Sequence, residues 1–490
     1  MNRKVNRRTL LKACAAGASA SLAASSMAAE VKPKTFRLVR DIPIEKEYDL
    51  VVAGGGPAGA AAAICAGRLG AKVLLVESSS CMGGMGTSGL VTAFDPMSDG
   101  KRTLVMGFMN EVVTTLYKRG FLGKRVTPKF WESSYMTWTP FQVEGYKLLL
   151  DELAVAAGIE VRFFTRLIDA DVAPRKSALN GVVLSNIEGY RYVKAKTFVD
   201  ATGDAVLANL CGVTCREAGR DTPHIMPATL CSLFANIDWS QRSKQQEALE
   251  KAIADGFFTQ PDRHMPGMSQ IGATTGYLNG GHIYELNALR CKSLTEGMML
   301  GRRLAQEYLK FFRKYVPGFE NTEHVTTASV MGVRESRRIL GEYELLHHDF
   351  LVRRDFPDQI GVFNKSIDVH PFNNSKEEYE KFLQEYLRTG KLNPGEHFGI
   401  PYGVIVPQGW NNLWVAGRGA SADVKVHGSI RVQPAASMMG QAAGTAAVQS
   451  IKTGQPANDL DTAQLVETLR SQGAYLPQER VSRKMTRTKA

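Results

Sequence analysis

Three glycines near the beginning of the chain have the spacing that binds a dinucleotide. Gly54, Gly56 and Gly59 follow the pattern G-x-G-x-x-G within VVAGGGPAGAAAA, Val51 to Ala63. In such a pattern the first glycine allows a tight turn, the second lets the backbone approach a pyrophosphate, and the third lets a helix pack closely on a strand. The first N–H groups of that helix then offer hydrogen-bond donors and partial positive charge to the phosphates. The glycines therefore predict a nucleotide-binding turn.

The elements expected around these glycines support the same interpretation. Tyr48 to Ala53 is typical of a short buried strand, an alanine-rich helix runs on through Leu69, and a second strand at Lys72 to Val76 ends in Glu77. An acidic residue about 20 positions beyond the glycines can bind a ribose hydroxyl, and it disfavours a 2′-phosphate. A glycine-rich turn without a ligand is the alternative, but it would not need the complete unit. NADP is therefore not expected.

Two later stretches distinguish FAD from NAD. Thr197 to Asp204 (TFVDATGD) predicts a strand that enters a turn, after a three-stranded meander with turns at Asn180-Gly181 and Glu188-Gly189. Leu413 to Ala446 begins LWVAGR and runs through HGSIRVQP into the small-residue helix AASMMGQAAGTAA. Pro434 stands where a first helical turn tolerates proline, and the start of that helix would direct partial positive charge at a ligand.

This order of elements resembles FAD-dependent oxidoreductases of the glutathione-reductase type. The resemblance implies FAD as the cofactor, with the rear helix facing the pyrimidine ring of the flavin. It also implies an α/β fold: a Rossmann-like FAD-binding domain in three layers, with an inserted α+β substrate domain. The expected segments are a signal peptide at 1–29, FAD-binding parts at 46–213 and 400–455, a substrate or cap region at 214–399, and a C-terminal helix with a basic tail at 456–490.

Further stretches resemble a bacterial FAD-dependent oxidoreductase family that is distantly related to the flavoprotein subunit of heterodisulfide reductase. They are Gly83–Gly89 (GGMGTSG), Met331–Tyr343 (MGVRESRRILGEY), Arg354–Ile360 (RDFPDQI), Ile367–His370 (IDVH) and Ile400–Arg418 (IPYGVIVPQGWNNLWVAGR). The chain lacks the clustered C-x-x-C ligands of the heterodisulfide branch, so its iron–sulfur clusters are not expected. Asp423–Val426 (DVKV) is more charged than the family pattern, and substrate specificity cannot be transferred across it.

The residues expected to contact FAD come from six places in the chain. They are Gly54, Gly56, Pro57, Ala58, Gly59, Glu77, Ser78, Gly83, Gly84, Met85, Gly86, Thr87, Ala201, Thr202, Gly203, Asp204, Gly417, Arg418, Pro434, Ala435 and Ala436. No metal site is expected. The cysteines are too sparse for a disulfide scaffold, and the single close pair, Cys211 and Cys215, makes neither a zinc nor an iron–sulfur site by itself.

Candidate catalytic residues are the polar side chains expected to face the flavin. Because a flavin accepts a hydride at N5, the protein has to orient the donor carbon, take a proton from the adjacent hydroxyl and bind the polar remainder. His427 is our candidate base and Arg431 would lie near the flavin oxygen or a substrate anion. The remaining candidates are Arg334, Arg338 and His370.

Structural roles compete with these assignments. An expected helical turn holding Arg334, Arg337 and Arg338 could not direct all three at one pocket, and Arg337 or Arg338 could instead pair with Glu335 or Glu342. A hydrogen bond of His370 to Asp368 or backbone is as reasonable as catalysis, and His282 is more typical of a structural residue. An amphipathic pattern of apolar residues predicts a helix that packs in the core: Leu294, Met298, Gly301, Ala305, Tyr308 and Phe312.

The start of the chain predicts export. A basic segment with Arg7-Arg8 precedes a weakly apolar, alanine-rich run, which resembles a twin-arginine (Tat) signal and implies a periplasmic or extracellular protein. A disordered basic tail is the alternative. No later segment has the roughly 18 apolar residues that cross a bilayer. The formal net charge of +12 is diffuse, so no nucleic-acid partner is expected.

Export constrains the reaction, because a nicotinamide pool is missing outside the cytoplasm. The expected function is hydride transfer from a small polar molecule, a hydroxy acid or sugar, to flavin, with electrons passed to a quinone, a cytochrome or oxygen. One alternative is reduction of an activated C=C bond, with the proton from Arg431 or Arg338. Another is a flavin electron-transfer subunit without its own substrate, although the long region 214–399 argues against it.

Overall fold

The computed structural model describes residues 35–477 apart from 128, 134–137, 175–176, 242–243 and 266. The predicted signal peptide and the basic tail beyond Pro477 therefore lie outside the described residues. Contacts group Met1–Ile42 into one unit and the chain from Pro43 onward into another. The second unit holds every helix and strand described below.

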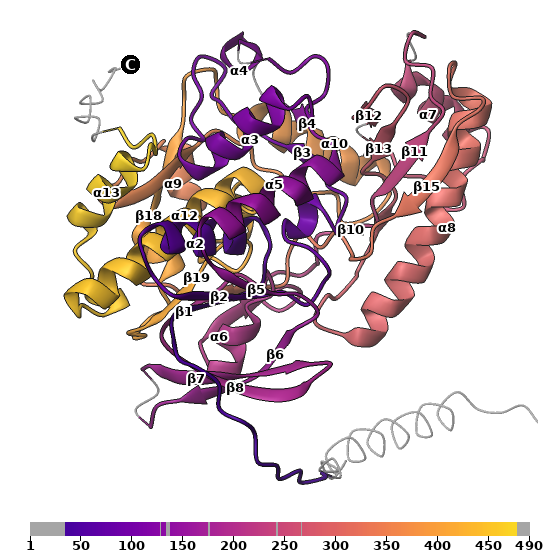
Figure 1. Ribbon diagram of the computed structural model, residues 1–490. Helices are drawn as coiled ribbons and strands as arrows, with labels where there is room; N and C mark the ends of the chain where they lie inside the picture. The colour runs from indigo at the N-terminus through magenta and orange to yellow at the C-terminus, as the bar shows by residue number, and fades with distance from the viewer. Residues whose placement is uncertain are drawn as a thin grey trace, which may run out of the picture. The chain divides into compact units, whose positions relative to one another are not determined.

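A parallel sheet lies at the centre of this unit (Figure 1). Its strands run in the order β5 (Glu160–Arg162), β2 (Val73–Val76), β1 (Tyr48–Ala53), β8 (Gly189–Asp200) and β19 (Leu413–Val415). The register pairs the last residue of β1 with the last residues of β2 and β8. The carboxyl ends of these strands therefore meet at one edge, which is where open α/β sheets bind their ligands.

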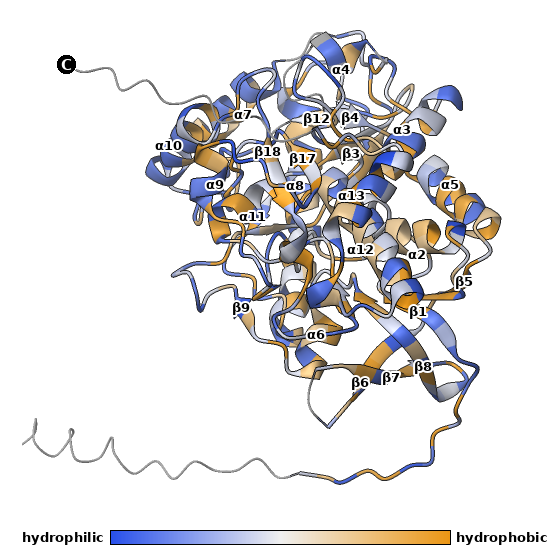
Figure 2. Ribbon diagram, turned by 90° about the vertical axis from the view of Figure 1, so that its left-hand side faces the viewer, coloured by the Kyte–Doolittle hydropathy of each residue, from blue (hydrophilic) through white to orange (hydrophobic). Residues whose placement is uncertain are grey.

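Alternating residues of β1 and β2 bury opposite faces of this sheet. Leu50 and Val52 pack into one apolar core with helix α2 (Pro57–Arg68) and helix α12 (Gln433–Thr453), whereas Val51 and Ala53 pack into a second core. Both faces are covered because successive side chains of a strand point to opposite sides. This arrangement gives the three layers that the sequence predicted. Figure 2 shows α2 largely in apolar colours and α10 largely in hydrophilic colours.

The second face is covered by helix α6 (Val206–Cys211) and by an antiparallel meander of β6 (Arg166–Val172), β7 (Leu179–Asn186) and the first part of β8. The Glu188-Gly189 turn is confirmed, with φ of +99° at Gly189. The Asn180-Gly181 turn was wrong, since both residues lie inside β7. A Cβ on Gly181 would lie 2.6 Å from the ring of Tyr192, so this glycine makes room for a cross-strand aromatic ring.

The inserted region mixes helices and strands, as predicted. A four-stranded antiparallel sheet, in the order β12-β13-β11-β15, packs with α7 and the long helix α8 (Cys291–Tyr315) at one side of the unit (Figure 1). The bounds of the remaining members are β11 Ser232–Ala235, β12 Met268–Gln270, β13 Gly276–Leu278, β15 Glu323–Thr327 and α7 Gln245–Ala254. Helix α8 confirms the amphipathic helix, although Leu294 and Met298 line a cavity instead of packing fully in the core.

The remaining elements connect these parts. They are η2 Gly84–Gly86, β3 Ala93–Phe94, α3 Phe108–Lys118, α4 Phe130–Ser133, β4 Thr139–Pro140, α5 Val143–Ala156, β9 Cys215–Glu217, β10 Ala228–Thr229, β14 His282–Ile283, β16 Arg337–Ile339, α9 His347–Leu351, β17 Gln359–Phe363, α10 Lys376–Gln384, η3 Glu385–Thr389, β18 Phe398–Pro401, η4 Tyr402–Ile405, α11 Val424–Ile430, η5 Ala457–Asp459 and α13 Thr462–Ser471. Among the described residues, no helix is both long and apolar enough to span a membrane.

Candidate functional site

The turn between β1 and α2 has the geometry that its three glycines predict. Gly54 has φ of +91°, and a Cβ there would lie 2.6 Å from the carbonyl oxygen of Ala201. A Cβ on Gly59 would lie 1.8 Å from the carbonyl oxygen of Gly54. By contrast, a Cβ on Gly56 would meet nothing within 4 Å. Gly54 and Gly59 therefore close the turn, while Gly56 leaves open space where a pyrophosphate can approach the backbone.

Glu77 is held against the same turn by two backbone N–H groups. Its carboxylate accepts hydrogen bonds from Gly55 N at 2.6 Å and from Ser79 N at 2.7 Å. The residue also lines the cavity that begins at the turn. The backbone thus fixes the carboxylate beside the open space, and the oxygens retain lone pairs for a ribose hydroxyl, since each carboxylate oxygen can accept more than one hydrogen bond.

A cavity of about 1220 Å³ runs from the glycine turn into the inserted region. It exceeds the volume of roughly 300–1,000 Å³ that is typical of ligand pockets, so it has room for a dinucleotide and a small substrate together. Most of the predicted cofactor residues line it: Gly54, Gly56, Pro57, Ala58, Glu77, Ser78, Gly84, Met85, Ala201, Thr202, Gly203, Asp204, Gly417, Arg418 and Ala436.

The other predicted cofactor residues do not line this cavity. Gly59 serves the turn, as described above. The hydroxyl of Thr87 donates to the carbonyl oxygen of Met82 at 2.7 Å and is buried. The predicted residues outside the cavity lining are Gly59, Gly83, Gly86, Thr87, Pro434 and Ala435.

Arg418 joins the front and rear parts of the site. Its guanidinium donates to Asp204 Oδ1 at 2.6 Å, to the carbonyl oxygen of Gly203 at 2.9 Å and to that of Val333 at 2.9 Å. Residues from three distant parts of the sequence are therefore fixed to one another at the edge of the parallel sheet.

The first turn of α12 faces the cavity. Val432, Gln433 and Ala436 line it, and the Gln433 side chain donates to the carbonyl oxygens of Val91 and Ala93. No side chain caps this helix start, so its free N–H groups and partial positive charge are available to a ligand. Together, the open turn at Gly56, the oriented Glu77 and this helix start fit FAD.

Comparison with known families agrees with this geometry. A family model described as FAD dependent oxidoreductase matches residues 49–469. The chain belongs to this family. FAD is therefore its cofactor, and the α/β fold predicted from the sequence is confirmed. No curated protein matches this FAD-dependent oxidoreductase in sequence. The relation to the heterodisulfide reductase subunit stays a prediction.

Solved structures with a similar fold include several flavoenzymes. A geranylgeranyl bacteriochlorophyll reductase-like protein from Thermoplasma acidophilum is 13% identical, with 89% of this chain and 85% of that chain covered and a TM-score of 0.46. A flavin-dependent brominase is 12% identical, with coverage of 87% and 83% and a TM-score of 0.43. A p-nitrophenol 4-monooxygenase from Pseudomonas putida is 10% identical, with coverage of 88% and 81% and a TM-score of 0.43.

The polar part of the FAD-dependent oxidoreductase cavity contains three of the five candidate catalytic residues. Arg334, Arg431 and His370 line it. Arg334 is 6% exposed and donates to the carbonyl oxygen of Pro227 at 2.5 Å and to Thr229 Oγ1 at 3.0 Å. Burial lowers the pKa of Arg334 to about 10, which still leaves the guanidinium charged at neutral pH.

His427, our candidate base, is not among the residues that line the cavity. It is 1% exposed on α11, and its Nε2 atom lies 3.0 Å from the carbonyl oxygen of Arg418. Burial, together with the charges of Arg338 and Arg431, holds the pKa of His427 well below its usual range. The structure therefore gives His427 a buried position behind Arg418, which does not support a role as the base.

Arg338 also lies away from the cavity. It is completely buried, donates to Asp221 and to the carbonyl oxygen of Ala422, and lies 3.6 Å from Glu335. The expected helical turn around it was wrong, because β16 pairs with β9 there in an antiparallel manner. The strand β16 spans Arg337–Ile339 and does not include Arg334, so no helical turn holds the two arginines on one face.

Several polar residues of the cavity were missed by the sequence analysis. Lys365 donates to Asp95 at 2.5 Å, and His264 lies beside His370, with ring centroids 4.4 Å apart. Burial opposes the charge on Lys365, but the adjacent Asp95 carboxylate raises its pKa above the usual range. Burial lowers the pKa of His264 to about 3. No local spacing marks these residues, since they come from segments far apart in the sequence.

Proposed function

We propose that this FAD-dependent oxidoreductase oxidises a small alcohol that carries a carboxylate, such as a 2-hydroxy acid. The observation that carries the proposal is Arg334. Among the described residues, no carboxylate lies within ion-pair distance of this buried guanidinium, whose hydrogen-bond partners are neutral oxygens. Burying a charge without a counter-ion is costly, so an anionic group of the substrate is the partner that Arg334 lacks.

Arg338 is a buried arginine of the same protein whose charge is paired with carboxylates. It lies four residues away and is surrounded by Asp221 and Glu335. Arg334 lines the cavity and Arg338 does not. The contrast favours a hydroxy acid over an uncharged sugar, because a sugar would leave the guanidinium without a counter-ion.

The remaining residues of the cavity orient such a substrate. Arg431 donates to the backbone oxygen of Asp368 at 3.0 Å, and its Nε atom has no hydrogen-bond partner among the described residues. It can therefore hold a second substrate oxygen. FAD supplies the acceptor for the hydride of the C–H bond, while the hydroxyl proton passes to the imidazoles and carboxylates around His370. The products are a 2-oxo acid and the reduced cofactor.

Reduction of the C=C bond of an unsaturated carboxylate is a second candidate. Arg334 would hold the same carboxylate, and Arg431, with its unpaired Nε atom, would supply the proton. A carrier without a substrate is less favoured, because the cavity continues beyond the residues expected for FAD and is lined there by Arg334, His370 and residues of α8 and α10.

Anaerobic spectroscopy of the purified flavin-loaded enzyme tests the proposal. We expect lactate, malate, tartrate or gluconate to bleach the oxidised flavin, and glucose or mannose to leave it oxidised. If sugars bleach it and hydroxy acids do not, the role of Arg334 is wrong. If fumarate or another enoate reoxidises the dithionite-reduced enzyme while no hydroxy acid reduces it, the reaction runs in the reductive direction.

We also propose export by the Tat pathway, with a quinone or a cytochrome as the electron acceptor. The support is the Arg7-Arg8 signal in the sequence, which lies outside the described residues. Changing both arginines to lysine should leave the precursor inside the cell with FAD bound. Export of that variant at the wild-type level would contradict the proposal.

A further inference from the structure

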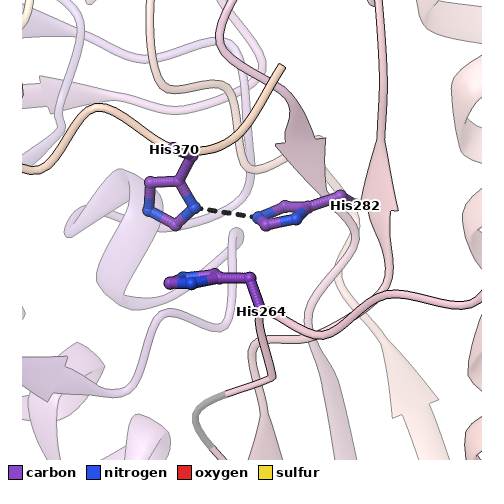
Figure 3. A group of neighbouring side chains, drawn as sticks. All are labelled: His264, His282 and His370. Carbon is purple, nitrogen blue, oxygen red and sulfur yellow. Dashed lines mark hydrogen bonds between the residues drawn. The ribbon is translucent and has the colours of Figure 1, made fainter. Parts of the chain in front are cut away.

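Three histidines from separate segments converge beside the substrate part of the cavity. His282 lies on β14, His264 precedes the sheet strand β12, and His370 follows β17 (Figure 3). Each offers one ring nitrogen, and these three atoms lie within 4.8 Å of one another. His282 and His370 are buried, and His264 is partly buried.

The outer nitrogens of two of these rings lie within ion-pair distance of carboxylates. His282 Nδ1 lies 3.1 Å from Asp262 Oδ2, and His370 Nε2 lies 3.4 Å from Asp368 Oδ1. A neutral imidazole has one N–H group and one lone pair. When the N–H groups are directed at the carboxylates, the inner nitrogens, His282 Nε2 and His370 Nδ1, both carry lone pairs. They are 2.8 Å apart, so a proton or a bound cation has to lie beside them.

We propose that His264, His282 and His370 bind one divalent transition-metal ion. Three imidazole nitrogens are a ligand set that Zn²⁺, Fe²⁺, Co²⁺ and Ni²⁺ accept, and such a set leaves coordination positions open to water or to an oxygen of the substrate. The site goes beyond the proposed function, because binding of the ion can be measured without any substrate. Discontinuous ligands explain why no spacing in the sequence indicated a metal.

The outer partners have the arrangement that supports metal-bound histidines. The Asp262 carboxylate accepts from the backbone N–H of His264 at 3.0 Å and from that of His282 at 3.0 Å. One buried carboxylate therefore positions two of the three ligand residues. Asp368 is held in turn by Arg431. Carboxylates that accept the second ring N–H fix the tautomer and orientation of metal-ligating histidines.

Binding requires small movements of the side chains. With metal–nitrogen distances of about 2.0–2.1 Å, two tetrahedral ligands lie about 3.3 Å apart, so His282 and His370 have to separate by a few tenths of an ångström. The ring of His264 is nearly parallel to that of His282, at 12°. It has to turn about its Cβ–Cγ bond to direct a nitrogen at the ion, and it lines the cavity, where there is space.

A proton shared by His282 and His370 is the competing arrangement. It would satisfy the two facing nitrogens, but it would leave both ring nitrogens of His264 without a hydrogen-bond partner among the described residues. An ion uses all three rings. Two carboxylates, those of Asp262 and Asp368, lie beside the rings of His282 and His370 and favour a cation there.

Metal analysis of the flavin-loaded full-length enzyme tests this site. After chelation and dialysis, we expect titration with Zn²⁺ or Co²⁺ alone to reach about one ion per chain, with the flavin content unchanged. The variants His282→Asn and His370→Asn should lose stoichiometric binding, and His264→Asn should weaken it. His427→Asn is the matched control, since it removes a buried histidine outside the cavity and should retain the ion.

Asp262→Asn provides a second test that leaves all three ligands in place. Loss of an outer carboxylate typically weakens metal binding about 10–100-fold, and this variant should show that decrease while keeping its FAD. The proposal is overturned if the folded, flavin-loaded wild type takes up no stoichiometric ion at saturating Zn²⁺ and Co²⁺. It is also overturned if His282→Asn binds the ion as well as the wild type. Neither result depends on whether a hydroxy acid reduces the flavin.

Discussion

Gly440 faces the carbonyl oxygen of Ala58 so closely that a Cβ at position 440 would lie 2.0 Å from that oxygen. One helical turn later, a Cβ on Gly444 would lie 2.1 Å from the carbonyl oxygen of Ala62. The two glycines of α12 thus let the rear helix rest directly on the backbone of α2. This contact sets the distance between the glycine turn at the front of the FAD site and the helix start at its rear.

Replacing Gly440 with valine should therefore damage both stability and cofactor binding. The side chain would meet backbone atoms that cannot turn away, and overpacking of this kind costs about 1–3 kcal/mol or more. We expect a lower thermal midpoint and a substoichiometric flavin content by absorbance. Gly123→Ala is the control, since a Cβ there has ordinary contacts at 3.5 Å. Wild-type stability and flavin content in Gly440→Val would contradict this account of the helix contact.

Alanine substitutions at Gly56 and at Gly59 should have different effects on folding and on FAD binding. Gly59→Ala places a Cβ 1.8 Å from the Gly54 oxygen, so it should reduce soluble, folded protein as well as FAD. Gly56→Ala meets open space in the protein, and it should fold normally but bind FAD more weakly, because the new methyl occupies the side from which the pyrophosphate approaches. Thermal unfolding and flavin titration measure the two effects. Equal behaviour of the variants would show that the two glycines do not have separate roles.

Replacement of Arg334 should lower the turnover of substrate, whereas replacement of Arg338 should lower the stability of the fold. Arg334→Gln removes the proposed anchor of the substrate carboxylate, and losses of about 2–5 kcal/mol are typical when a buried charge partner is removed. We expect kcat/KM for a hydroxy acid to fall at least 30-fold with unchanged flavin content. Arg338→Gln breaks a buried ion pair, so it should lower the free energy of unfolding by about 3–5 kcal/mol. If Arg334→Gln changes only stability, the anchor assignment is wrong.

Acid should destabilise the protein through its buried histidines. Burial lowers the pKa of His264 to about 3, and burial with nearby arginines holds the pKa values of His370 and His427 well below 6.5. As pH falls below about 6.5, the unfolded state binds these protons and the folded state does not. Stability is thus complete above about pH 6.5 and is lost toward pH 3, by about 1.4 kcal/mol per pH unit for each histidine.

Thermal unfolding between pH 8 and pH 5 measures this loss in His427→Asn and in the wild type. The variant should show a shallower decrease, and its rate of flavin reduction should equal that of the wild type, because His427 does not line the cavity. His348→Asn, which replaces an exposed histidine, is the control and should follow the wild-type curve. A slower flavin reduction in His427→Asn would return this residue to the list of catalytic candidates.

The nucleotide-binding unit could be predicted from the sequence because its pattern is local. The strand at Tyr48–Ala53 has the predicted bounds, and Gly54, Gly56 and Glu77 take the predicted places around the turn. In this unit, residues close to one another in the sequence determine the backbone conformation: apolar runs form strands, glycines allow the turn, and the helix follows directly. The predicted turn at Asn180-Gly181 was wrong because of a long-range contact. The ring of Tyr192 requires a glycine at position 181, inside a strand.

The sequence patterns and the family resemblance thus predicted the α/β fold class and FAD as the cofactor, and most of the residues predicted to contact FAD line the cavity. Only the packing of the whole chain settled which charged side chains line the cavity. Arg334 and Arg338 are four positions apart, yet one lines the cavity and the other is buried in ion pairs. His264, His282 and His370 meet although they come from distant segments. Whether such distant residues lie close together depends on how strands and helices pack across the whole chain, and no local spacing in the sequence indicates that packing.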